Sequence, residues 1–251
     1  MHPANRKEYP MQETAPQLDL SAFALSSYDS VRIVMPPQPV ATDDDIDAQL
    51  FVYVASATNH SSIRSIGDLT DEWVKSQFDG ISTMAELRAG IKQDLEHQGM
   101  VAWSNTKFQK CSDALVARLE GELPADVVAA NIEASHAQYE QRLKSFGSTK
   151  ERYLREEHLT PEQFEEKLRD DVVFQLKLNA ALDKMIEAMG TEVAPSELTE
   201  YLSTDDPDAF LAEIEANGRM ADAQRAAARV KVMRSVVDTA IVETEGDAPA
   251  A

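Results

Sequence analysis

Apolar residues recur every three to four positions through most of the chain, the spacing that lines one face of an α-helix. The clearest stripe begins at Thr83, which forms a capping-box pair with Glu86. No proline interrupts this stripe before Pro124. The pattern predicts one long helix from Thr83 to Gly121, with Gly99 as a candidate bend.

Further helices are predicted before and after Gly190, which is a helix-stop signal. Pro124 is placed to open one helix at its first turn, and Thr160-Pro161-Glu162-Gln163 is a capping signature for the next. Shorter helices follow Pro195 and Pro207, and a long one is expected over 221–242. The sequence therefore predicts an all-α body of long helices with two helix–turn–helix arms.

The N-terminal part of the chain has a different pattern. Residues 1–28 show no sustained period and predict a mobile tail with three docking points, Leu18, Leu20 and Phe23. A short strand is predicted at 31–34 and a helix from Thr42, although its run Leu-Phe-Val-Tyr-Val is also strand-prone. Residues 244–251 resemble a second tail.

Composition narrows the classes of partner. Lys and Arg number 24 against 44 Asp and Glu, which gives a formal net charge of −20. This balance argues against nucleic acid and anionic membranes, because few cations are available to replace phosphate counterions. No apolar run reaches the length of a transmembrane helix, and no apolar stretch of a signal peptide follows the first residues. The expected location is the cytoplasm.

The sequence contains no recognisable catalytic or metal-binding motif. The five His lack the spacing of a helical metal pair, and no phosphate-binding glycine loop or nucleophile elbow occurs. Cys111 has apolar neighbours at helical offsets and is interpreted as a buried small hydrophobe. We therefore predict no catalytic residue, no metal site and no cofactor.

The order of these segments resembles the bacterial trigger factor family. The stretch D-S-V-R-I-V-M-P-P-Q-P-V-A-T-D-D-D-I-D-A-Q-L is similar to the family's linker, and L-T-D-E-W-V-K followed by S-T-M-A-E-L-R-A-G-I-K-Q-D-L-E to the start of its helical C-terminal domain. The segment E-L-P-A-D-V-V-A-A-N-I-E resembles the opening of its first arm. The resemblance covers roughly residues 29–243.

This resemblance implies a domain plan with four parts between two tails, 1–28 and 244–251. They are a helical chaperone-like domain over 29–243, made of a linker strand and helix (29–66), body helices (67–123), a first arm (124–190, tip near 147–160) and a second arm (191–243, tip near 203–218). Two family features are missing from the sequence. The ribosome-docking Gly-Phe-Arg-x-Gly-x-x-Pro signature is absent, and only about a dozen residues separate Ala57 from Leu69, where the isomerase domain is normally inserted.

The resemblance implies an ATP-independent chaperone that binds unfolded or nascent polypeptides through an apolar cradle, with no direct ribosome contact and no isomerase activity. Exposed apolar side chains are the expected binding groups. The candidates, each also suited to ordinary packing between helices, are Met100, Val101 and Trp103 on the body, Phe146, Tyr153 and Leu154 at the first tip, and Phe210 and Leu211 at the second.

Two other interpretations remain open. The same apolar stripes suit a structural or assembly module that forms a homodimer, weak or tight, or that binds one fixed protein partner. The family name also suggests a protein associated with prolyl isomerisation. The segment where the isomerase domain would be inserted is too short to contain one, so we predict no such enzymatic activity.

Overall fold

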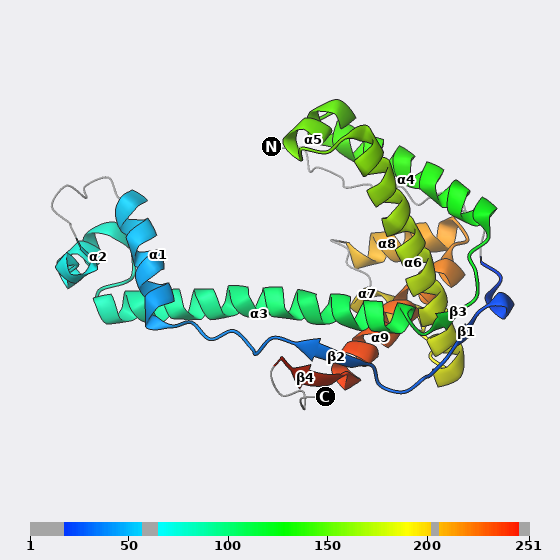
Figure 1. Ribbon diagram of the computed structural model, residues 1–251, viewed down its shortest axis with the longest axis horizontal. Coiled ribbons are helices and arrows are strands. Elements are labelled where there is room, and N and C mark those ends of the chain that lie inside the picture. The colour runs from blue at the N-terminus through cyan, green and yellow to red at the C-terminus, as the bar shows by residue number, and fades with distance from the viewer. Residues whose placement is uncertain (1–17, 57–64, 202–205, 246–251) are drawn as a thin grey trace. The chain divides into compact units, whose positions relative to one another are not determined.

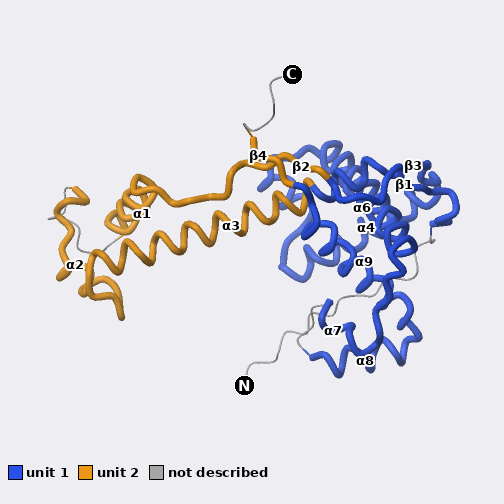
Figure 2. Tube along the Cα trace, turned by 90° about the horizontal axis from the view of Figure 1, so that it is seen from below, with its two compact units in different colours: residues 1–31, 111–241 blue, residues 32–110, 242–251 orange. Residues whose placement is uncertain are grey.

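The computed structural model describes residues 18–56, 65–201 and 206–245, and it is predominantly helical (Figure 1). The described residues form nine α-helices and four short strands, which confirms the predicted all-α class. Contacts divide the chain into two compact units, unit 1 with residues 1–31 and 111–241 and unit 2 with residues 32–110 and 242–251 (Figure 2). Helix α3, Met84–Val116, continues from unit 2 into unit 1.

Unit 2 is built around α1, Asp43–Ser56, α2, Asp71–Gln77, and the first part of α3. Its core consists of buried aliphatic side chains from these helices and the short η2 turn, Ile66–Asp68. The predicted capping box is present, because Glu86 accepts from the amide of Thr83 and donates its own amide to the Thr83 hydroxyl. The core residues are Ile46, Leu50, Leu69, Val74, Leu87 and Ile91.

The segment between β2, Arg32–Met35, and α1 runs close to α3. A Cβ atom on Gly99 would lie 2.8 Å from Cβ of Pro39, so only glycine permits this approach. Near the same place, the indole Nε1 of Trp103 donates to the carbonyl oxygen of Pro36 at 3.0 Å. The role of Gly99 is therefore close packing against Pro39 within a helix that continues past it.

Strand β4, Ile241–Thr244, pairs with β2. The amide of Ile241 donates to the carbonyl of Val31, and the amide of Glu245 donates to that of Met35. Both partners advance by four residues, so the two strands run parallel. The final helix, α9, Met220–Thr239, stops before this strand instead of reaching residue 242 as the sequence predicted.

Unit 1 contains both predicted arms. The first is α4, Ala125–Ser145, α5, Lys150–Glu156, and α6, Pro161–Met189. The second is η3, Pro195–Glu197, α7, Leu198–Tyr201, α8, Pro207–Ala216, and α9. Helix α6 packs against α4 on one side and α9 on the other (Figure 1).

The α6–α9 contact includes the most buried ion pair among the described residues of this unit. Nε and Nη2 of Arg229 donate to the two carboxylate oxygens of Asp183 at 2.7 and 2.6 Å. The Asp183 side chain is 8% exposed. A bidentate pair at this depth fixes the orientation of the two helices. Burial removes water from both charged groups, and a rotation that broke the two hydrogen bonds would leave these groups unpaired.

A small antiparallel pair joins the start of the described chain to the end of α3. Strand β1, Ala24–Leu25, pairs with β3, Leu119–Glu120, with Ala24 opposite Glu120 and Leu25 opposite Leu119. Phe23 and Leu25 are buried. Residues 20–25, which the sequence assigned to a tail, thus form the short turn η1, Leu20–Ala22, and this strand, while residues 1–17 lie outside the described part of the chain.

Candidate functional site

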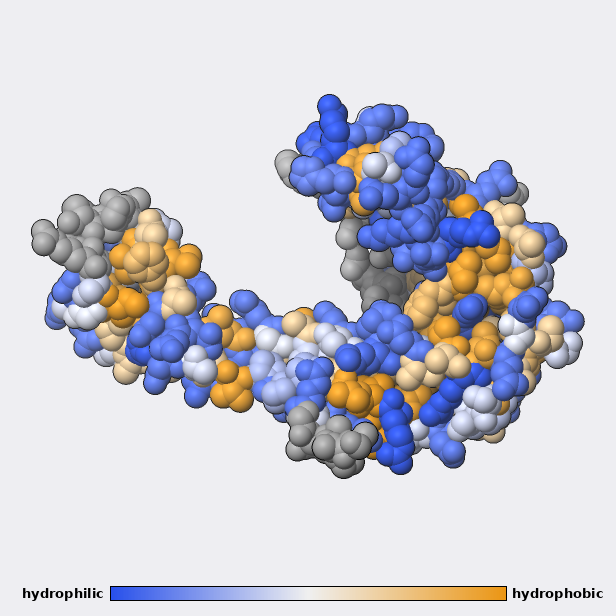
Figure 3. All heavy atoms as spheres, viewed as in Figure 1, coloured by the Kyte–Doolittle hydropathy of each residue, from blue (hydrophilic) through white to orange (hydrophobic). Residues whose placement is uncertain are grey.

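An open groove of about 600 Å³ lies between α4 and α6 in unit 1. Figure 3 shows apolar surface over the region where these helices lie side by side, bordered by hydrophilic side chains. More apolar than polar surface lines the groove. Its lining residues come from α4, α6 and the segment before α4: Leu123, Ala125, Val128, Ala129, Ile132, Glu133, His136, Arg169, Val173 and Lys177.

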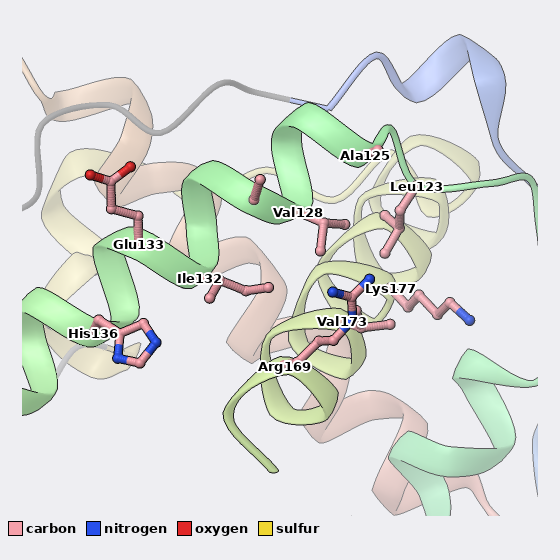
Figure 4. A pocket seen from close by; sticks show the side chains of 10 residues that line it. Leu123, Ala125, Val128, Ile132, Glu133, His136, Arg169, Val173 and Lys177 are labelled. Carbon is pink, nitrogen blue, oxygen red and sulfur yellow. The ribbon is translucent and has the colours of Figure 1, made fainter. Parts of the chain in front are cut away.

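The groove follows from helical spacing on its two walls. Val128, Ile132 and His136 are four residues apart on α4, so they share one face. On α6, Val173 lies one turn from both Arg169 and Lys177. Figure 4 shows Val128 and Ile132 pointing from α4 toward α6. Each wall therefore presents aliphatic surface to the groove.

Two cations border the apolar floor. Figure 4 shows Arg169 extending past Val173 toward the groove and Lys177 at its other end, while Glu133 points away from α6. Neither Arg169 nor Lys177 forms an ion pair with any other residue that the structure describes. In a chain with a net charge of −20, two cations that line an apolar groove and form no ion pair with a described residue stand out.

His136, at the end of the groove, is engaged with Glu165. Its Nε2 lies 2.7 Å from Oε2 of Glu165, and Nζ of Lys150 donates to the other carboxylate oxygen at 2.8 Å. The hydrogen bond from Lys150, followed by the charges of His136 and Lys150, lowers the pKa of Glu165 below its ordinary value. This network ties α4, α5 and α6 together at the tip of the first arm.

An aromatic cluster stabilises the same tip. The ring of Tyr139 lies edge-on to Tyr153 at 5.3 Å and to Phe164 at 5.0 Å between centroids. The ammonium group of Lys150 lies 4.5 Å from the centroid of Phe164. Burial, and next the hydrogen bond with Tyr153, raise the pKa of Tyr139 to about 12. The phenol therefore stays protonated at neutral pH.

The three candidates at the first tip have different environments. Phe146 follows α4 and is 78% exposed, the largest exposed fraction among the big apolar side chains that the structure describes. Tyr153 is half-buried in the aromatic cluster, and Leu154 is half-buried on α5. Of the three, Phe146 offers the most surface to a partner, whereas Tyr153 also serves the arm's own packing.

The second-arm candidates are partly committed to packing. Leu211 packs against a core cluster that includes Val193 and Leu198, and Phe210 is half-buried. Residues 203–205 of the predicted tip lie outside the described residues. Phe210 and Leu211 thus remain candidates with limited exposed surface.

The body candidates belong to unit 2, and the other five belong to unit 1. Val101 is 48% exposed on α3, whereas Met100 is half-buried. Trp103 is half-buried and its indole is bonded to Pro36. Their binding role stays a prediction, with Val101 the most accessible of the three.

The sequence alone does not reveal the α4–α6 groove as a site. Val128 and Ile132 have the spacing of one apolar helix face, but no motif marks Arg169, Val173 and Lys177 as lying opposite them. The available signal was a single valine between two cations at helical spacing on α6. The packing of α6 against the face of α4 that carries Val128 is tertiary structure, and the spacing of residues within one helix does not reveal it.

The described residues include no cluster of three or more His, Cys, Asp or Glu that could hold a metal ion. Cys111 is buried, as the sequence predicted. Among the described helices, none has both the length and the apolar composition needed to cross a bilayer.

Comparison with known sequences then decides the family. The profile described as "Bacterial trigger factor protein (TF) C-terminus" matches residues 83–238, more than half of the chain. The chain belongs to this family. This trigger factor C-terminal region is the chaperone part of that protein and not the isomerase part, so membership supports a chaperone-type role.

The matching curated relatives are longer than this chain. Trigger factor of Bacillus cereus (strain B4264) is 24% identical over 136 residues, and those of Bacillus thuringiensis (strain Al Hakam) and Bacillus anthracis (strain CDC 684 / NRRL 3495) are 23% identical over the same length. Each alignment covers 54% of this chain and 32% of the relative. The aligned part of this trigger factor-like chain is therefore about a third of the length of these relatives.

Proposed function

We propose that this chain is an ATP-independent chaperone that binds apolar segments of unfolded or nascent polypeptides. The observation that carries the proposal is the open apolar groove between α4 and α6 on a trigger factor C-terminal scaffold. The half-buried Ile132 and Val173 line it with aliphatic side chains, together with the buried Val128. An exposed apolar groove lowers its free energy when a client side chain displaces water from it.

Weak binding at several points suits such a chaperone better than one deep pocket. Besides the groove, Phe146 and Val101 each expose about half or more of their surface. We propose these two as secondary contacts, together with the less exposed candidates Met100, Trp103, Tyr153, Leu154, Phe210 and Leu211. The net charge of −20 would keep the protein dispersed while it holds an apolar client.

The proposed activity needs neither ribosome docking nor prolyl isomerisation by these 251 residues. Their sequence lacks the docking-loop signature, and the segment between Ala57 and Leu69 is too short for an isomerase domain. A Pro-peptide isomerisation assay should therefore show no acceleration over the uncatalysed rate. A measurable acceleration would overturn this part of the proposal. Cytoplasmic location likewise stays a prediction.

The main test measures suppression of client aggregation. A chemically denatured client is diluted with the full chain at near-equimolar ratio, without nucleotide, and light scattering is followed. We expect the chain to delay scattering. Ile132→Asp should reduce this effect strongly, because a charge on the groove floor opposes burial of apolar client groups.

Met189→Asp is the matched control. Met189 is also an apolar residue on a long helix of the first arm, is 49% exposed and lies outside the groove lining. This variant should protect the client as the parent chain does, and circular dichroism checks that both variants fold. No protection by the parent chain at tenfold excess would reject the chaperone proposal, and a tight stoichiometric dimer without client affinity would favour the assembly-module interpretation.

A further inference from the structure

The cations at the groove indicate which client segments it prefers. Arg169 and Lys177 are eight residues apart on α6, with Val173 midway between them. At about 1.5 Å rise per residue, their backbone positions are roughly 12 Å apart along the helix. Val173 thus lies on α6 between the two residues that carry the positive charges.

These charges are available to a ligand. Neither side chain forms an ion pair within the described ranges 18–56, 65–201 and 206–245. Glu133 borders the same groove but points away from α6 (Figure 4), and His136 is engaged with Glu165. The two side chains can therefore pair with carboxylates of a ligand, although the whole chain is acidic.

We infer that the groove selects extended apolar segments flanked on both sides by acidic residues. An extended chain advances about 3.3 Å per residue, so residues i and i+4 span roughly 13 Å and point to the same face. The matching pattern is acidic–x–apolar–x–acidic, in which the apolar side chain contacts Val173 and Ile132 and each carboxylate pairs with one cation. This inference rests on the proposed chaperone function and specifies its substrate class.

Long-range and local electrostatics predict opposite preferences, which makes the inference testable. A net charge of −20 alone would favour basic peptides over acidic ones. At physiological ionic strength, however, charges beyond about 8 Å are largely screened, so the nearby Arg169 and Lys177 should dominate. Two partly exposed ion pairs correspond to about a threefold to tenfold gain in affinity.

The experiment compares three labelled peptides with one apolar centre, flanked by Glu, Ser or Lys at the i and i+4 positions. Fluorescence anisotropy with the full chain gives each dissociation constant at two salt concentrations. We expect the Glu-flanked peptide to bind about threefold to tenfold tighter than the Ser-flanked one, the Lys-flanked one to bind weakest, and the differences to shrink at high salt.

Substitutions test whether Arg169 and Lys177 cause the preference for Glu-flanked peptides. Arg169→Gln/Lys177→Gln should bind the three peptides with nearly equal affinity. The control Arg155→Gln/Lys167→Gln has the same change in net charge at exposed positions outside the groove lining and should keep the preference. Retention of the preference in the first variant, or its loss in the control, would overturn the assignment.

The outcomes separate this inference from the proposed function. Equal binding of all three peptides by the parent chain, or tightest binding of the Lys-flanked one, would reject the acidic-flank preference while leaving apolar client binding intact. No binding of any peptide, together with no protection from aggregation, would reject the proposed function itself. Concentration-dependent self-association that blocks peptide binding would assign the groove to a second copy of the chain and reject the inference.

Discussion

The two halves of α6 use the same helix for different purposes. From Leu178 to Met185 nearly every side chain is buried, including the small residues Ala180 and Ala181. Over 161–177, only Phe164 and Val172 are buried. The half that packs against α9 is closed and fixed by an ion pair, whereas the half facing α4 leaves a groove open. Stability is concentrated in one half, which permits incomplete packing in the other.

The largest expected effect is the loss of the Asp183–Arg229 pair. Asp183→Ala leaves the guanidinium partly buried without its carboxylate, which costs roughly 3–5 kcal/mol of unfolding free energy, toward the lower end because Arg229 is 25% exposed. Urea unfolding followed by circular dichroism measures this change. Glu156→Gln, which removes an exposed pair with Arg152, is the control and should have no measurable effect. Equal stability of the two variants would contradict the division of α6.

A pair of alanine substitutions tests the two halves directly. Ala181→Leu adds volume where no space exists, since Ala181 is fully buried, and should cost about 1–3 kcal/mol. Ala129→Leu makes the same change at an exposed position on the groove wall and should stay within about 0.5 kcal/mol of the parent. The same unfolding assay compares them. If both substitutions cost the same, the groove is packed as tightly as the α6–α9 interface.

The smallest expected effect concerns Glu165 at the arm tip. Because its pKa is lowered in the folded state, its charged form contributes stability above its ordinary pKa of 4.5, and this contribution is lost as pH falls through the lower folded value. The melting temperature of the parent chain should therefore fall more than that of Glu165→Gln when pH drops from 7 to 3. The difference should be under about 2 °C, because Glu165 and its partners His136 and Lys150 are partly exposed. If the melting temperatures of the two proteins changed in parallel with pH, the hydrogen bonds of Glu165 would contribute nothing to stability.

Helix starts were predictable because their signals are local. Thr160 and Gln163 form the reciprocal capping bonds that their spacing indicates, and Pro161 occupies the first turn of α6. The end of α6 at Gly190 also follows from a local signal, whereas the end of α3 depends on a partner far away in sequence. Helix α3 stops at Val116 and not at Gly121, because the following residues pair with β1. No local pattern in two-residue strands distinguishes them from loops.

The candidate site was predictable only in part, for a similar reason. The apolar stripe of α4 follows from the spacing of Val128 and Ile132, and the high exposure of Phe146 agrees with its place in a turn. The groove depends on which face of α6 opposes that stripe. The importance of Arg169 and Lys177 depends further on their forming no ion pair with a described residue, which requires knowledge of the packing.

The pairing of β2 with β4 has a consequence for synthesis of the chain. Strand β2 ends at Met35 and its partner β4 begins at Ile241, so about 200 residues must be translated between them. At about 5–20 residues per second, β2 waits roughly 10–40 s with its ladder groups unpaired. During that interval it is an open strand edge, the kind of feature that invites wrong partners. This sheet is thus completed only after residues 241–244 have been made.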